Sequence, residues 1–153
     1  MLTNNPELIK ELVNAGADVN AQSEDGSVLS VAIQYNDNIE ILSFLLEKGA
    51  DINMKNNNNL TPLMEAIRYE KKNFIPMLLK SKADVNAQNH EGISALMIAV
   101  TLNRIEAVQA LIEAGANVNA QGENGITALI LASSEEIGAD PKIKEMLIKA
   151  GAK

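Results

Sequence analysis

The sequence predicts an all-α protein, a solenoid of helix-turn-helix units joined by β-turn loops. Two observations support this fold class: a short motif recurs at a fixed spacing, and the apolar residues between its copies keep the period of a helix. A fixed repeat of this length is typical of solenoids, in which each unit buries its apolar face against the next.

The repeated motif reads Gly-Ala-Asp-Val-Asn in its first copy. It occupies residues 16–20, 49–53, 82–86 and 115–119, so that each copy begins 33 residues after the last. A leucine keeps the same spacing at Leu12, Leu45, Leu78 and Leu111, and the next one, Leu147, comes three residues late. These two columns define the length of one unit.

Each unit is expected to hold two short helices. In the first helix a leucine precedes an alanine by three residues, as Leu63 precedes Ala66, which places both on one helical face. In the second helix, apolar residues such as Ile41, Leu42 and Leu45 follow one another at helical spacing. Three helix starts are marked by a capping side chain before a proline, at Asn5 and Pro6, Thr61 and Pro62, and Asp140 and Pro141.

Three positions depart from this pattern. Pro76 would break a helix, unless the helix starts after Asn73, because a proline in the first turn removes an amide that needs no partner. Lys82 stands in a helix-end column that is otherwise glycine, where a left-handed backbone is expected. We therefore expect a weak point or a different cap at Lys82. In the turns, Asn59 replaces a glycine and tolerates the same conformation.

The columns predict one domain over residues 1–153, divided into repeats. An N-terminal partial repeat (1–20) precedes full repeats over 21–53, 54–86 and 87–119, and a C-terminal capping repeat covers 120–153. Glu11 and Lys144 stand in columns that are otherwise apolar, as expected where a terminal repeat lacks a neighbour. Pro6 leaves no room for a full helix before it, so the N-terminus is either a single-helix cap or has been trimmed.

The composition argues against several classes of function. The formal net charge of −7 and the pI near 4.7 argue against binding to nucleic acid or to an anionic membrane surface. The absence of cysteine excludes disulfides and cysteine-ligated zinc. No apolar run approaches the roughly 20 residues that span a bilayer, and the start of the chain does not read as a signal peptide. A cytoplasmic monomer is expected.

The pattern resembles the ankyrin repeat, in which a Thr-Pro-Leu-His helix start, a second helix and a Gly-Ala-Asp-Val-Asn exit follow one another. Residues 61–64, Thr-Pro-Leu-Met, match that helix start most closely. The family's histidine bonds back to the threonine and on to a neighbouring turn, and here Ser30, Met64, Met97 and Ile130 replace it. Stability is therefore expected to depend more on apolar packing. The resemblance implies a protein-binding scaffold that catalyses nothing.

The sequence offers little material for an active site. Its one histidine, His90, falls at a predicted turn tip beside Glu91, where a solvated side chain is expected. Glu135, Glu136 and Asp140 form the one acidic cluster that could hold an ion, and a solvated charged loop is the simpler interpretation. We expect no catalytic residue, no cofactor and no metal.

In proteins with ankyrin-like folds, partners mostly contact a concave face made of turn tips and the exposed side of the first helices. By column, the resemblance implies a partner-binding surface at Tyr35, Arg68, Tyr69, His90 and Leu102. The same columns also hold Glu24, Asp25, Gln34, Asn57, Asn58, Glu65, Glu91, Thr101, Glu123, Asn124, Ser134 and Glu135. Tyrosine and arginine are enriched in interface hot spots. The alternative is that the two tyrosines only cover the ends of the first helices.

Together these features predict a protein-interaction module that binds one macromolecular partner. One alternative is a targeting or regulatory domain of a larger protein whose catalytic part lies outside this chain. Another is a stand-alone enzyme or ion-binding protein, which would need unexpected chemistry in the loop from Glu135 to Asp140. The sequence does not identify the partner, because function depends on the site and not on the fold.

Overall fold

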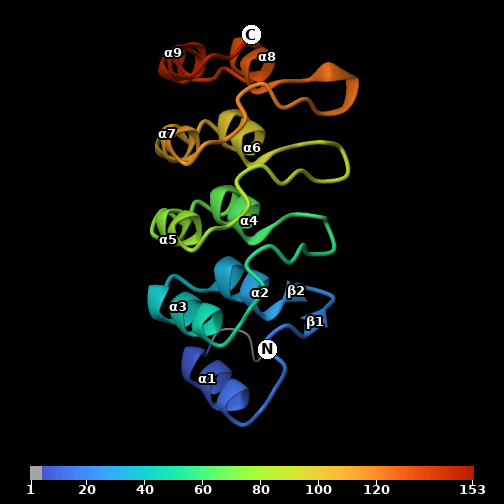
Figure 1. Ribbon diagram of the computed structural model, residues 1–153, viewed down its shortest axis with the longest axis vertical. Helices are drawn as coiled ribbons and strands as arrows, with labels where there is room; N and C mark the ends of the chain where they lie inside the picture. The colour runs from blue at the N-terminus through green and yellow to red at the C-terminus, as the bar shows by residue number, and fades with distance from the viewer. Residues whose placement is uncertain (1–4) are drawn as a thin grey trace. The chain divides into compact units, whose positions relative to one another are not determined.

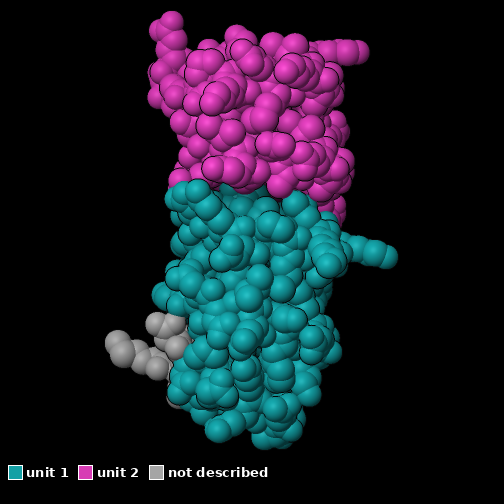
Figure 2. Space-filling view, turned by 90° about the vertical axis from the view of Figure 1, so that its left-hand side faces the viewer, with its two compact units in different colours: residues 1–83 teal, residues 84–153 magenta. Residues whose placement is uncertain are grey.

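The computed structural model describes residues 5–153, which form two compact units. Unit 1 holds the described residues up to Ala83, and unit 2 is Asp84–Lys153, as coloured in Figure 2. Both units consist mainly of paired short helices, and the only strands in the described residues are two of two residues each. The predicted all-α class is confirmed, with one small hairpin in addition.

Unit 1 begins with a single helix and continues with two helix pairs (Figure 1). Its elements are α1 (Pro6–Asn14), β1 (Gln22–Ser23), β2 (Gly26–Ser27), α2 (Val28–Tyr35), α3 (Ile39–Glu47), α4 (Pro62–Arg68) and α5 (Phe74–Lys80). The antiparallel hairpin pairs Gln22 with Ser27 and Ser23 with Gly26. Within this unit α2 packs against both α3 and α4, and α1 packs against α3.

Unit 2 contains two helix pairs and one turn of 3-10 helix. Its elements are α6 (Ala95–Thr101), α7 (Ile105–Glu113), the 3-10 turn η1 (Glu123–Gly125), α8 (Ala128–Ser133) and α9 (Pro141–Lys149). The first helices α6 and α8 pack together, and so do the second helices α7 and α9 (Figure 1). The loop between α8 and α9 contains Gly138, which has a φ of +59°.

The repeated leucines form the core of each unit. Leu45 and Leu78 in unit 1, and Leu111 and Leu147 in unit 2, are fully buried. The first helices bury an alanine in each repeat: Ala32, Ala66, Ala99 and Ala132. A side chain this small lets neighbouring helices approach closely, so the alternation of leucine and alanine columns fits the repeats together.

Local capping fixes the helix starts. The hydroxyls of Ser27, Thr61, Ser94 and Thr127 each accept a hydrogen bond from the backbone N–H three residues later, at 3.1–3.4 Å. Asn5 caps α1 by accepting from the amides of Glu7 and Leu8, and Asp140 caps α9 by accepting from the amide of Lys142. The capping predicted before Pro6, Pro62 and Pro141 is thus confirmed. Helix α5 begins after Asn73, as expected from Pro76, although the Asn73 side chain makes no capping hydrogen bond.

The helix exits use a left-handed residue at the glycine column. Gly49 has a φ of +90°, and its amide donates to the Leu46 carbonyl at 3.1 Å. Lys82 adopts the same region with a φ of +65°, and its amide donates to the Leu79 carbonyl, also at 3.1 Å. Lys82 therefore uses the same backbone cap as glycine, and the expected weak point is the strain that its Cβ brings. Asn59, with a φ of +58°, confirms the prediction for the turn.

Candidate protein-binding surface

Three of the five predicted binding residues lie together in unit 1. Tyr35 is the last residue of α2, Arg68 is the last residue of α4, and Tyr69 follows directly as the C-cap of α4. Because α2 and α4 pack against each other, both tyrosines belong to one layer of first helices. Tyr35 is 45% exposed and Tyr69 is 37% exposed, whereas most of the two helices is buried. The tyrosines are thus available to a partner and are held by a well-packed framework.

An ion pair ties together the loops that follow these tyrosines. The Lys71 ammonium contacts Asp37 Oδ1 at 2.6 Å and donates to the Asn36 carbonyl at 3.0 Å. The Lys71 side chain is largely buried, while Asp37 is exposed. Sequence reasoning missed this contact, since Asp37 and Lys71 lie 34 residues apart and no pattern in either loop connects them.

Glu65 does not belong to this surface. The column assignment placed it on the exposed side of its helix, but the side chain points inward and only 2% of the residue is exposed. Its Oε1 atom accepts a hydrogen bond from Asn56 Nδ2 at 2.7 Å. The same position holds Val31 in the preceding repeat, which is also buried, whereas Ile98 and Leu131 at this position in unit 2 are only partly buried. The prediction for Glu65 was wrong because a carboxylate was assumed to be solvated.

Burial also controls the electrostatics of Glu65. Desolvation raises the pKa of this carboxyl above its ordinary value, and the side chains of Ser30 and Asn56 and the charge of Arg68 oppose that rise. Within the described residues, the Ser30 hydroxyl and Glu65 Oε2 are buried without a hydrogen bond of normal length. Glu65 is therefore a buried acidic group that is only partly satisfied.

The other two predicted residues lie in unit 2, at different ends of one helix. His90 is exposed in the turn that precedes α6, whereas Leu102 caps the C-terminal end of α6 and is 38% exposed. The turn of His90 is held by Asn89, whose Oδ1 accepts from the amides of Glu91 and Ile93 at 3.0 and 2.8 Å. Both residues are accessible, and the length of α6 separates them.

Asparagines of the exit motif join neighbouring repeats, a role that the sequence reasoning did not assign. In unit 1, Asn20 Nδ2 donates to the Gly49 carbonyl at 3.0 Å, and its Oδ1 accepts from the Asp51 amide at 2.7 Å. In unit 2, Asn119 makes the equivalent pair of bonds to the Gly151 carbonyl and the Lys153 amide, at 3.0 and 2.8 Å. The recurrence of asparagine at the fifth motif position was the available signal.

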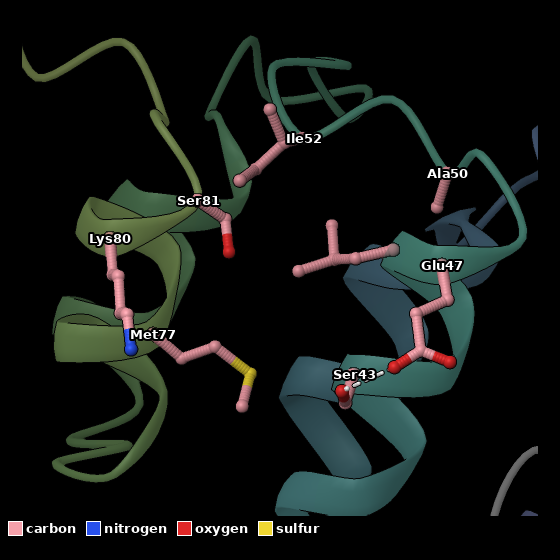
Figure 3. A pocket seen from close by; sticks show the side chains of 8 residues that line it. Ser43, Glu47, Ala50, Ile52, Met77, Lys80 and Ser81 are labelled. Carbon is pink, nitrogen blue, oxygen red and sulfur yellow. Dashed lines mark hydrogen bonds between the residues drawn. The ribbon is translucent and has the colours of Figure 1, made fainter.

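The second helices of each unit carry a groove of their own. In unit 1 a groove of about 570 Å³ lies between α3 and α5, with Glu47 on one wall and Met77 and Lys80 on the other (Figure 3). Ser43 Oγ donates to Glu47 Oε1 at 3.2 Å at its edge (Figure 3). In unit 2, Gln109, Glu113, Met146 and Lys149 line an equivalent groove of about 360 Å³ between α7 and α9.

The acidic loop between α8 and α9 shows no feature of an ion site. Glu135 and Glu136 are exposed, and the Asp140 carboxylate caps α9 by accepting from the Lys142 amide at 2.8 Å. Across residues 5–153 no three histidine, aspartate or glutamate side chains gather as a candidate metal site. Among these residues no helix has the length and apolar content needed to cross a membrane.

Comparison with known proteins agrees with the repeat pattern and the helix pairs. A search of curated proteins finds no match. A family model that describes ankyrin repeats in three copies matches residues 1–89 and residues 81–153, which together cover the whole chain. The departures at the histidine column and at Lys82 are therefore variations within a known repeat. The chain belongs to the ankyrin repeat family.

Proposed function

We propose that this chain is a non-catalytic interaction module that binds a protein partner through the surface that carries Tyr35, Arg68 and Tyr69. Unit 2 offers His90 and Leu102 as further contacts. Ankyrin repeats are generally protein-protein interaction modules, which supports the class of function. The exposed pair of tyrosines at the ends of two packed helices is the observation that carries the choice of surface.

The chemistry of these side chains supports the choice. Tyrosine and arginine supply a large share of the binding energy at many interfaces, because they combine a broad apolar surface with hydrogen-bonding groups. The buried helices behind them and the Lys71–Asp37 ion pair hold this edge in place. A surface that is ordered before binding loses less conformational entropy when the partner docks.

The net charge supports further parts of the proposal. A chain with a formal charge of −7 is repelled by nucleic acid phosphates and by anionic lipids, so neither is proposed as a partner. We propose that the module acts as a monomeric scaffold in the cytoplasm. Sedimentation velocity tests the monomer, and imaging of the tagged protein in its native cells tests the compartment.

The test begins with affinity capture from native cell extract, followed by titration of the purified partner against variants. We expect Tyr35→Ala, Arg68→Ala and Tyr69→Ala to weaken binding, with at least one of them costing more than about 1 kcal/mol. Their melting temperatures should stay close to the parent value, because surface substitutions usually change stability by no more than ~0.5 kcal/mol.

Matched variants in the second-helix grooves provide the control. Lys80→Glu and Gln109→Glu alter exposed residues of α5 and α7 and should leave binding unchanged. If these two variants abolish binding while the three alanine variants bind normally, the partner uses the second helices and the proposed surface is wrong.

A further inference from the structure

Helix α1 carries an exposed leucine, Leu12, at a position that is part of the core in later repeats. Leu12 is 48% exposed, whereas Leu45, Leu78, Leu111 and Leu147, which hold the same place in later repeats, are all 0% exposed. In those repeats the second helix packs against a first helix of its own. No such helix lies beside α1 in the described residues (Figure 1). Leu12 therefore belongs to an apolar face without a partner.

This face forms one wall of a groove at the end of unit 1. Ile9, Leu12 and Val13 of α1 line one side, Val28 and Val31 of α2 line the other, and Ala21 lies on the loop that joins them. The groove has a volume of about 300 Å³ and is mostly apolar. Its position corresponds to the place of a first helix in a complete repeat.

The next repeat of the same unit shows what fits such a position. There the first helix α2 packs against the second helix α3, and its residues Leu29, Ala32 and Ile33 are each no more than 1% exposed. A short α-helix with this apolar stripe is thus the shape that this architecture accepts. A helix of about two turns has the matching length, since α2 has eight residues.

The chain segment that forms the groove is rich in acidic residues. Five carboxylates lie within residues 5–31: Glu7, Glu11, Asp18, Glu24 and Asp25. Lys10 is the one basic side chain in this segment, and it already pairs with Glu7 at 3.2 Å. Asp18 lines the groove itself, and Glu11 precedes Leu12 on α1. An occupant with basic residues flanking its apolar stripe, next to the edges of the groove, therefore complements this rim.

We infer that the groove between α1 and α2 is a docking site for a basic amphipathic helix of a protein partner. The helix occupies the place of a first helix and buries Leu12 and Val13 beneath its apolar stripe. This site is separate from the tyrosine surface, so the inference goes beyond the proposed function and does not rest on it.

The probe is a fluorescein-labelled synthetic helix that carries leucine, alanine and isoleucine at the spacing of Leu29, Ala32 and Ile33, with lysines at the positions that flank this stripe. We expect it to bind the full chain, as measured by fluorescence anisotropy, and to weaken as salt rises. A peptide of the same composition in scrambled order, and one with glutamates in place of the lysines, should each bind about tenfold more weakly or worse.

Two variants of the protein separate the apolar and the charged contributions. Leu12→Arg places a charge in the groove and should weaken binding about tenfold or more, whereas Ile148→Arg, at a 54% exposed position on α9, should have no effect. Glu11→Lys should weaken the binding of the lysine peptide and strengthen the binding of the glutamate peptide. Circular dichroism checks that each variant keeps the helical fold.

Several results would overturn the inference. They are equal binding of the scrambled peptide, unchanged binding by Leu12→Arg, and absence of binding to the parent chain. Dimerisation of the parent chain that Leu12→Arg abolishes and the peptide does not compete with would assign the groove to a second copy instead. Tyr35→Ala should bind the peptide normally, which keeps this test independent of the tyrosine surface.

Discussion

Glu65 connects a turn to a helix by means of a buried hydrogen bond. Its partner, Asn56, also organises the turn, because Asn56 Oδ1 accepts from the amides of Asn58 and Leu60 at 2.9 and 3.0 Å. One carboxylate thus fixes the side chain that shapes the loop before α4. Its cost is desolvation, and its benefit is the bond to Asn56.

The desolvation of Glu65 makes the stability of the folded protein depend on pH. Burial raises the pKa of Glu65, so the folded protein holds this proton more tightly than the unfolded chain does. Its contribution to stability is therefore fully present below the ordinary pKa of glutamate, and it is lost as the pH rises through the raised folded value. Glu65→Gln keeps the size and the acceptor for Asn56 but cannot ionise.

We expect the stability of Glu65→Gln relative to the parent to increase as the pH rises through this window and then to stay constant. Urea denaturation across the pH series measures the difference. A difference that is flat, or that falls with rising pH, would show that the folded state does not disfavour the ionised Glu65.

Lys82 bears backbone strain that a single substitution should relieve. An L-residue in the left-handed region costs roughly 1–2 kcal/mol, and glycine adopts this region freely. The Lys82 cap otherwise matches that of Gly49. We therefore expect Lys82→Gly to stabilise the chain by about 1 kcal/mol in thermal denaturation, after the extra entropy of the unfolded glycine is subtracted. Gly49→Ala should have the opposite effect, and a Lys82→Gly variant less stable than the parent would contradict the argument.

At the scale of elements, the repeats are joined by polar contacts as well as by the leucine core. The side-chain amide of Asn20 bonds to both a carbonyl and an amide of the next helix exit, and Asn119 does the same in unit 2. Each asparagine thus bonds to two backbone groups of the neighbouring repeat. The fifth position of the motif needs a side chain that both donates and accepts.

Removing one of these bridges should loosen the stack. We expect Asn20→Ala and Asn119→Ala each to lower the free energy of unfolding by about 1 kcal/mol, since two exposed hydrogen bonds between repeats are lost. The control is Asn58→Ala, which changes an exposed asparagine at a turn tip and should cost no more than ~0.5 kcal/mol. Equal losses for all three variants in urea denaturation would mean that the bridging bonds contribute nothing specific.

The sequence predicted what depends on local chemistry and period. The helix starts at Pro6, Pro62 and Pro141 follow from neighbouring residues and are confirmed. The repeated leucines Leu45, Leu78, Leu111 and Leu147 are buried, whereas Leu12 of the same column is exposed. The burial of Glu65 and the Lys71–Asp37 pair depend on side chains brought together from distant segments. A column assignment takes each residue's polarity as a guide to exposure, so it fails where a polar side chain finds a buried partner. The five predicted binding residues are all accessible, and their role stays a prediction.

At the scale of the whole molecule, apolar packing replaces the hydrogen bonds of the family's histidine at its position in most repeats. Met64 and Met97 are buried at that position, and so is Ser30, while Ile130 near the C-terminus is 54% exposed. A buried methionine fills space and makes no bond to a neighbouring turn. This agrees with the expected reliance on apolar packing. It also leaves the C-terminal repeat with an apolar side chain in water at Ile130, so polar substitutions in the terminal repeats matter for solubility.

Glu11 on α1 and Lys144 on α9 are those polar substitutions, and both are exposed. The residues in the Lys144 column of earlier repeats, Leu42 and Val108, are fully buried. Glu11→Leu and Lys144→Val therefore extend an apolar surface at each end, and we expect each variant to self-associate in sedimentation velocity as its concentration rises. Glu40→Leu adds the same kind of side chain to an exposed position on α3 and should leave the chain monomeric. If Glu11→Leu and Lys144→Val behave like Glu40→Leu, exposed apolar area at the ends does not drive association, and the capping interpretation of these two residues fails.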